Sequence, residues 1–218
     1  MFVKICGITS EEDALLAVAM GADALGFNFT PCERQIAPGK AADIAKRLPP
    51  DVLTVGIFRN DAPDRVIKVT LGAGLNAAQL HGHETAEETR EVRSKVPFVI
   101  KAFSAGDEGL RRADDYGADA IHIDSAAPGS GEVFDWALAE GAPSNRRIIL
   151  AGGLTPENVV DGIERVRPWG VDVATGVEKS PGVKDPTKLK DFINAAKRAS
   201  PAPYEGGPER PFDWLDDA

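Results

Sequence analysis

The stretch VKICGITSEEDALLAVAMGADALGFNF, residues 3–29, decides the fold, because it holds a strand, a helix and a second strand in one short unit. One β-rich apolar run begins at Val3 and the next begins at Ala24. Between them, Thr9 followed by Glu12 predicts a helix N-terminus with a capping box. The apolar face of this helix is predicted from helical spacing to contain Leu15, Val18, Ala19 and Ala22.

The same unit recurs along the chain. Further apolar runs begin near Val52, Ala77, Phe98, Ala120, Ile148 and Val171, so that eight runs start 21 to 28 residues apart. This spacing predicts parallel strands joined by right-handed helical crossovers. Eight such units close into a barrel, whereas an open doubly wound sheet normally uses five or six strands. We therefore expect a single-domain α/β protein, a (β/α)8 TIM barrel over residues 1–198.

Two later helices carry start signals that combine a capping residue with proline. Thr155-Pro156 and Asp185-Pro186 each place a cap before a proline at the first helical position. The first is followed by apolar residues at helical spacing, Val159, Val160, Ile163 and Val166, and the second by Leu189, Phe192, Ile193 and Ala196. These stretches predict the last two helices of the barrel.

Residues 199–218 differ in composition from the rest of the chain. Positions 201–218 contain four prolines, two glycines, five acidic residues and one arginine. Proline and mutually repelling acids do not support a core, so we expect an irregular acidic C-terminal extension. Phe212, Trp214 and Leu215 are nevertheless apolar enough to dock on another surface.

Composition limits the classes of function. The 218 residues include 25 basic and 34 acidic side chains, a net charge of -9, which gives no basic surface for nucleic acid or an anionic membrane. No apolar run approaches the roughly 18 residues that span a membrane, and the N-terminus turns acidic too early for a secretory signal. We expect a cytoplasmic protein with a small-molecule partner.

Candidate site residues lie where the strands end, because the active site of an eight-stranded barrel sits at the carboxyl ends of its strands. Gly152-Gly153 follows the seventh strand, and Thr175-Gly176 follows the eighth. Glycines in these two loops let backbone N–H groups approach an anion, and this favours phosphate binding over a plain turn.

Cys6 ends the first strand and Asp124 the sixth, and each has an ordinary structural interpretation beside a catalytic one. Cys6 could be an inert buried thiol, or a base whose pKa is lowered by a nearby cation. Asp124 could merely cap a turn, or act as a general acid in a partly dry cleft. Cys32, in the second loop, is either a surface residue or the partner of Cys6 in a reversible disulfide.

Two further side chains suit a polar ligand. Arg34 can present a planar fork to a carboxylate or phosphate, or can lie at the surface. His81 and His83 have a spacing that could begin a metal site, but the chain has only three histidines and no convincing further ligands. We therefore expect His81 to be a polar wall group, His83 a loop residue, and no metal or cofactor.

Five segments in register resemble the phosphoribosylanthranilate isomerase family, a barrel of the tryptophan pathway. They are KICGIT at 4–9, QLHG at 79–82, the Asp124 strand end with PGSGEVFDW at 128–136, LAGGLTPENV at 150–159 and GVDVATGVEKSPGVKD at 170–185. The resemblance covers residues 1 to about 198. It implies a cofactor-independent Amadori rearrangement of N-(5-phosphoribosyl)anthranilate.

The resemblance also implies residue roles. Cys6 would be the general base and Asp124 the general acid, while Arg34 would pair with the anthranilate carboxylate. His81 and Asp172 would line the substrate site. The phosphate would be held by Gly152, Gly153, Thr175 and Gly176.

The chain departs from the family pattern at three places. The usual Ser-Pro-Arg-Tyr is Cys-Glu-Arg-Gln, which puts Glu33 beside Arg34; the usual GTGK is GSGE, which ends in Glu132; and the usual Ser-Ser before Gly176 is Ala-Thr.

Two alternative functions stay open. One is an isomerase of a related phosphoribosyl amine, the histidine-pathway aminoaldose, which needs a second anion site. The other is a non-catalytic phosphate-binding or interaction module. The protein is expected to be a monomer or homodimer.

Overall fold

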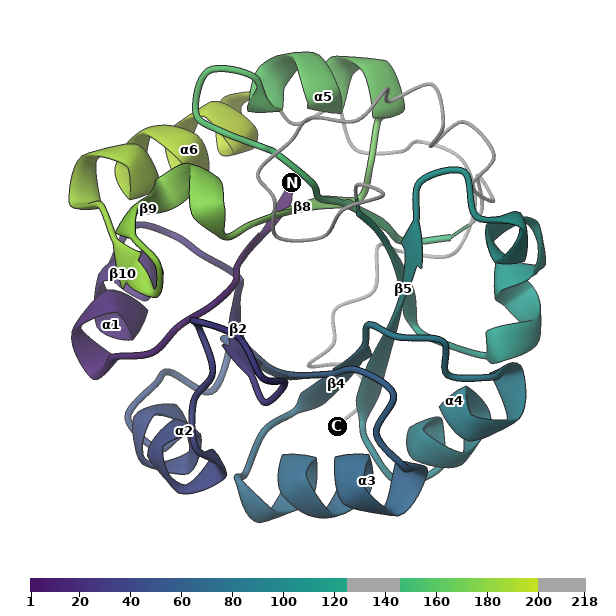
Figure 1. Ribbon diagram of the computed structural model, residues 1–218. Helices are drawn as coiled ribbons and strands as arrows, with labels where there is room; N and C mark the ends of the chain where they lie inside the picture. The colour runs from purple at the N-terminus through teal and green to yellow at the C-terminus, as the bar shows by residue number, and fades with distance from the viewer. Residues whose placement is uncertain (125–145, 200–218) are drawn as a thin grey trace.

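A computed structural model describes residues 1–124 and 146–199 and contains a closed barrel of eight parallel strands (Figure 1). Each strand pairs with the next, and the last pairs with the first. The strands are β1 (Phe2–Ile5), β2 (Ala24–Asn28), β3 (Leu53–Phe58), β4 (Ala77–Leu80), β5 (Phe98–Ser104), β6 (Ala120–Asp124), β7 (Ile148–Leu150) and β8 (Gly170–Val173). The predicted (β/α)8 barrel is confirmed, and every predicted strand start is within one residue of the observed one.

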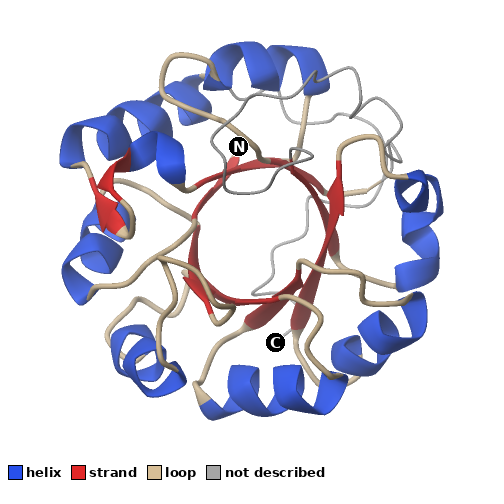
Figure 2. Cartoon of the chain, viewed as in Figure 1, coloured by secondary structure: helices blue, strands red, loops and turns tan. Residues whose placement is uncertain are grey.

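Helices form a ring around the barrel (Figure 2). They are α1 (Glu11–Ala19), α2 (Pro38–Ala45), α3 (Pro63–Gly72), α4 (Ala86–Arg93), the 3-10 helix η1 (Glu108–Tyr116), α5 (Val159–Val166) and α6 (Pro186–Arg198). After β8 come a short 3-10 turn, η3 (Thr175–Val177), and a hairpin of β9 (Glu178–Ser180) and β10 (Val183–Lys184). This hairpin lies at the edge of the barrel beside α1 (Figure 1), and the Lys184 backbone N–H donates to Asp13 of that helix. None of the helices in the described part of the chain is long and apolar enough to cross a membrane.

Two apolar clusters hold the barrel together. The larger one packs the strands against the helices, and α6 contributes to it through Leu189, Phe192, Ile193 and Ala196. The smaller one consists of strand residues, and Phe2 stacks on Trp169 beside it with ring centroids 4.3 Å apart. Most members of the smaller cluster are the first residues of their strands, so it fills the amino end of the barrel. The carboxyl end is left for polar side chains.

Two helix starts differ from the prediction. The N-cap of α1 is Ser10, whose hydroxyl accepts from the Asp13 backbone N–H, while the Thr9 hydroxyl donates to the Gly182 carbonyl. The register of α1 is therefore shifted, and its buried residues are Asp13, Ala14 and Ala17, with Leu15 42% exposed. Tertiary contact with the β9–β10 hairpin took Thr9 away from the capping role.

The start of α5 is also later than predicted, whereas that of α6 is confirmed. Thr155 lies in a turn that is closed by the Asn158 side chain, and α5 begins only at Val159. Asp185 does cap α6, because its carboxylate accepts from the backbone N–H groups of Thr187 and Lys188. The boundary between the barrel, 1–198, and the tail, 199–218, stays a prediction, since residues 200–218 lie outside the described residues.

Candidate active site

A cavity of about 480 Å³ opens at the carboxyl ends of the strands. It is lined by residues from both halves of the barrel, among them Cys6, Arg34, His81, His122, Asp124, Gly152, Gly153, Asp172 and Thr175. The topology therefore brings together eight of the nine residues that the sequence selected, and adds His122. The ninth, Gly176, is not among the lining residues and packs against the Leu154 carbonyl.

Cys6 follows β1, and its backbone N–H donates to the Val173 carbonyl on the neighbouring strand β8 at 2.8 Å. The half-buried thiol is free, as is the exposed Cys32. Burial raises the pKa of the Cys6 thiol, the nearby Asp172 raises it further, and Lys4 and Lys184 act to lower it. The thiol thus lies between opposing charges, and these charges control how readily it ionises.

Asp172 joins Lys4 and His122 in a buried chain of polar contacts inside the barrel. The Lys4 Nζ donates to Asp172 Oδ2 at 2.8 Å, and the His122 Nε2 lies 2.9 Å from the same oxygen. Burial acts to raise the pKa of Asp172, but attraction to Lys4 and the hydrogen bond from His122 hold it well below its usual range. Asp172 is therefore an anion, and its position between two donors identifies it as an organiser of the site.

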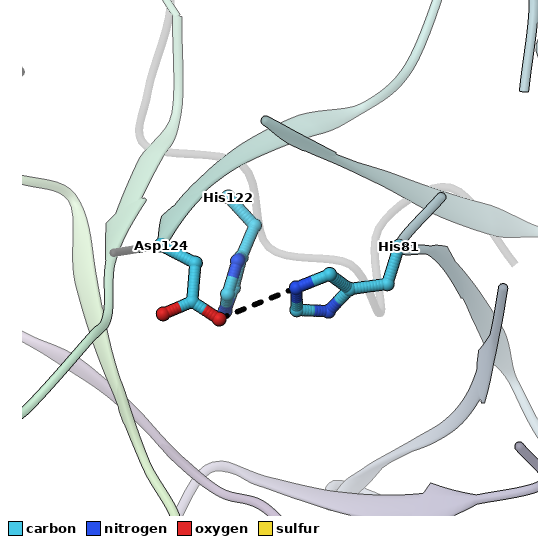
Figure 3. A group of neighbouring side chains, drawn as sticks. All are labelled: His81, His122 and Asp124. Carbon is cyan, nitrogen blue, oxygen red and sulfur yellow. Dashed lines mark ion pairs between the residues drawn. The ribbon is translucent and has the colours of Figure 1, made fainter. Parts of the chain in front are cut away.

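Asp124, His81 and His122 meet on one wall of the cavity (Figure 3). The His81 Nε2 lies 3.2 Å from Asp124 Oδ2, and the rings of the two histidines meet edge to face with centroids 5.2 Å apart. On its other side, the His81 Nδ1 lies 2.9 Å from the Gln79 amide nitrogen. The sequence analysis found no further ligand near His81, but the fold supplies His122 and Asp124. The sequence did contain a clue to His122: it lies two residues before Asp124 on β6, so both side chains point to the same face of that strand.

Arg34 is held by a carboxylate that the sequence analysis gave no role. Its Nε donates to Glu178 at 3.0 and 3.1 Å, and its Nη2 donates to Glu178 Oε2 at 2.7 Å. Lys184 also donates to Glu178, at 3.1 Å, and to the Cys6 carbonyl at 2.6 Å. These bonds hold the pKa of Glu178 below its usual range, although burial acts to raise it. Glu178 thus orients Arg34, whereas Glu33 is exposed.

The two glycine loops differ in what they require of glycine. Gly152 and Gly153 line the cavity with φ angles of 84° and 67°, which side chains rarely tolerate. At Gly176 the limit is space, because a Cβ there would lie 1.9 Å from the Leu154 carbonyl oxygen. Gly176 therefore lets the loop after β8 pack on the loop after β7, and Thr175 faces the cavity. The predicted loop at 128–136, with Glu132, lies outside the described residues.

Comparison with known proteins identifies the family of this chain. The family model for N-(5'-phosphoribosyl)anthranilate (PRA) isomerase matches residues 3–195. The chain belongs to the PRA isomerase family. Among curated relatives, the PRA isomerase of Desulforudis audaxviator is 48% identical over 204 residues, which cover 90% of this chain and 98% of the relative. The resemblance inferred from the strand ends is thus confirmed.

Solved PRA isomerases share the fold closely. The crystal structure of the Thermus thermophilus protein superposes with a TM-score of 0.84 at 44% identity, covering 91% of this chain and 99% of that one. A PRA isomerase in complex with reduced 1-(o-carboxyphenylamino)-1-deoxyribulose 5-phosphate superposes with a TM-score of 0.80 at 42% identity, with 91% and 99% coverage. The chain is therefore an enzyme of this family.

Proposed function

We propose that this chain isomerises N-(5'-phosphoribosyl)anthranilate to 1-(2-carboxyphenylamino)-1-deoxyribulose 5-phosphate in tryptophan biosynthesis, with Cys6 as general base and Asp124 as general acid. The observation that carries the proposal is that these two side chains come from the ends of β1 and β6 and line one cavity. An Amadori rearrangement needs one group that donates a proton and one that accepts a proton at a single sugar.

The reaction begins with two proton transfers. Asp124 gives its proton to the furanose ring oxygen, the C1–O bond breaks, and the anthranilate nitrogen supplies the electron pair that forms an iminium. Cys6, as the thiolate, then removes the proton from C2, and the C2–H electron pair neutralises the iminium to an enolamine. The enolamine then becomes the ketose product as the proton leaves the C2 hydroxyl and a proton is added at C1. Return of the Cys6 proton to Asp124 through solvent resets the enzyme, so that no atom is gained or lost and no oxidant is needed.

The surroundings of Cys6 fit the role of a base. Burial, together with the charge of Asp172, raises the pKa of the thiol, and Lys4 and Lys184 limit that rise. Lys4 is fully buried, and Lys184 is buried while bonded to the Cys6 carbonyl. Two fixed ammonium groups therefore favour the thiolate from within the barrel.

The rest of the cavity suits the two ends of the substrate. We assign the anthranilate carboxylate to Arg34, because a guanidinium held by Glu178 presents its donors in a fixed direction. The phosphate is assigned to the loops at Gly152, Gly153, Thr175 and Gly176, because glycine loops let backbone N–H groups approach an anion and Gly152, Gly153 and Thr175 line the cavity. His81 and Asp172 are assigned to the wall between these ends.

The test is turnover of PRA, followed by loss of substrate fluorescence, in the wild type and in Cys6→Ser and Asp124→Asn. Each substitution is expected to reduce kcat by about 10² to 10⁴-fold, the usual contribution of one acid or base. Cys32→Ser is the matched control, because Cys32 is the other thiol of the chain; it is exposed at the rim of the same cavity and is assigned no role. Full activity in both active-site variants, or none in the wild type, would reject the assignment.

Other properties stay predictions with simple tests. The aminoaldose alternative is not favoured, and it would regain support only if the bisphosphorylated compound bound tightly.

The oligomeric state is also a prediction. The phosphoribosylanthranilate isomerase of Thermotoga maritima is dimeric, and monomers generated from it have been crystallised. This chain is expected to be a monomer or homodimer, and analytical ultracentrifugation would distinguish the two. Cytoplasmic location and lack of nucleic acid binding are tested by cell fractionation and by gel shift.

A further inference from the structure

Two histidines and one aspartate form a compact donor cluster on the cavity wall, here called the His81–His122–Asp124 cluster (Figure 3). One ring nitrogen of each histidine and one carboxylate oxygen of Asp124 lie within 4.8 Å of one another. We propose that this cluster is a binding site for Zn²⁺ or a similar divalent transition-metal ion, and that the bound ion blocks the active site.

The donor set selects the class of metal. Imidazole nitrogens suit zinc, copper, nickel and iron, whereas magnesium and calcium prefer oxygen ligands alone. Two histidines with one carboxylate, plus water in the fourth position, is the composition of open zinc sites in enzymes. Cys6 lines the same cavity, but the cluster is complete without a thiolate.

The distances are close to those that zinc requires. Ligands bound tetrahedrally at about 2.0–2.1 Å from zinc lie roughly 3.3 Å from each other. The separation of 3.2 Å between His81 Nε2 and Asp124 Oδ2 already has this value. The widest separation in the cluster must contract by about 1.5 Å to reach the same spacing, and rotation of a side chain supplies a movement of this size without moving the backbone.

Two buried nitrogens in the cluster have no hydrogen-bond partner in the described part of the chain. They are Nδ1 of His122, a residue only 1% exposed, and Nε2 of His81, whose contact with Asp124 is not aligned as a hydrogen bond. Buried polar atoms are normally satisfied, so unpartnered nitrogens beside a carboxylate point to a missing ligand.

The second shell also fits a metal site. Metal-binding histidines usually give their other ring nitrogen to a carboxylate, carbonyl or water. His122 contacts Asp172 at 2.9 Å through Nε2, and Asp172 is in turn held by Lys4. His81 contacts the Gln79 amide at 2.9 Å through Nδ1, and a turned amide would offer its oxygen, which has no partner among the described residues.

Binding forms coordinate bonds only, and a proton on Asp124 is released to solvent when its oxygen takes the ion. Inhibition rests on the proposed function: an oxygen bound to the metal cannot deliver a proton to the sugar. Metal binding itself does not rest on that function.

The experiment measures zinc binding and turnover separately on the full chain. Metal-free protein is titrated with Zn²⁺ by calorimetry in thiol-free buffer, and with Co²⁺ by visible absorption. The wild type is expected to bind one ion per chain, and His122→Asn to weaken binding at least about tenfold, the lower end of what second-shell changes already cost. His83→Asn and Cys32→Ser are matched controls, because an exposed histidine and an exposed thiol outside the cluster should not alter the affinity.

Each outcome decides a separate point. Unchanged binding in His122→Asn, or loss of binding in Cys32→Ser, would overturn the site. If circular dichroism shows that His122→Asn does not fold, His81→Gln takes its place under the same criterion. Zinc that binds at the cluster without EDTA-reversible loss of turnover would overturn the inhibition. Zinc binding by a wild type that does not turn over PRA would leave the site standing and reject the proposed function.

Discussion

Opposite substitutions at the Lys4–Asp172 pair should move the pKa of the Cys6 thiol in opposite directions. Lys4 favours the thiolate and Asp172 opposes it. Asp172→Asn removes the opposing charge and leaves an unpaired ammonium near the sulfur, so the thiol pKa should fall. Lys4→Met removes the favourable charge and leaves the Asp172 carboxylate with His122 as its remaining partner, so the thiol pKa should rise.

Both variants should nevertheless lose stability by similar amounts. Lys4 is fully buried and Asp172 is 6% exposed, with 2.8 Å between Nζ and Oδ2. Removing one partner of a buried pair leaves an uncompensated charge, which costs about 3–5 kcal/mol. For a domain of this size 1 kcal/mol corresponds to about 2–4 °C in Tm, so each variant should melt about 6–20 °C lower. Lys4→Met combined with Asp172→Leu should recover much of this loss.

The assay is the rate of alkylation of Cys6 by iodoacetamide as a function of pH, in a Cys32→Ser background that leaves one thiol. The midpoint of the rate gives the thiol pKa, and thermal unfolding gives the stability of the same samples. If both variants moved the midpoint in the same direction, general loosening of the barrel would explain the result. If neither moved it, the lysine would not act on the sulfur, and the reasoning about the base would fail.

Three further predictions concern stability and binding. Gly176→Ala should lower the free energy of unfolding by about 1–3 kcal/mol, because the added methyl overpacks against Leu154, and it should raise KM. In the control Gly39→Ala the added methyl meets nothing within 4 Å, so neither stability nor KM should change. Thermal unfolding and steady-state kinetics compare the two variants. Asp185→Ala should cost about 1 kcal/mol in denaturant unfolding, because α6 loses its cap. Arg34→Lys should raise KM at least about tenfold while kcat changes less, since a lysine cannot hold Glu178 and also bind the substrate carboxylate through two parallel hydrogen bonds.

The fold followed from the sequence because periodicity is a local property. Eight runs of similar spacing leave one closed topology, and the strand starts were found to within a residue. Helix starts were less predictable, because capping depends on what else competes for the cap residue. Thr9 has the right side chain for a cap, but the Gly182 carbonyl, 173 residues away, takes its hydroxyl.

The site divides in the same way. Site residues at strand ends, such as Cys6 and Asp124, could be predicted from their positions after the apolar runs and from the resemblance to the family. Their partners could not, because Glu178 and Lys184 reach Arg34 and Cys6 only through the hairpin that folds back after β8. Contacts between the first and last parts of a chain leave no trace in local pattern, and so the electrostatics of the base required the structure.

The pKa of the Cys6 thiol depends on the pairing of β1 with β8, the two strands that close the barrel. Lys4 on β1 and Asp172 on β8 are direct partners in the register of the two strands that close the ring. Lys184, beyond β8, donates to the Cys6 carbonyl at the end of β1. Every charge that lowers the pKa of Cys6 therefore depends on the β1–β8 seam, either as one of its residues or as a bond across it. A chain with an open seam would keep the cysteine but lose the fixed ammonium groups beside it, and the pKa of the buried thiol would rise further.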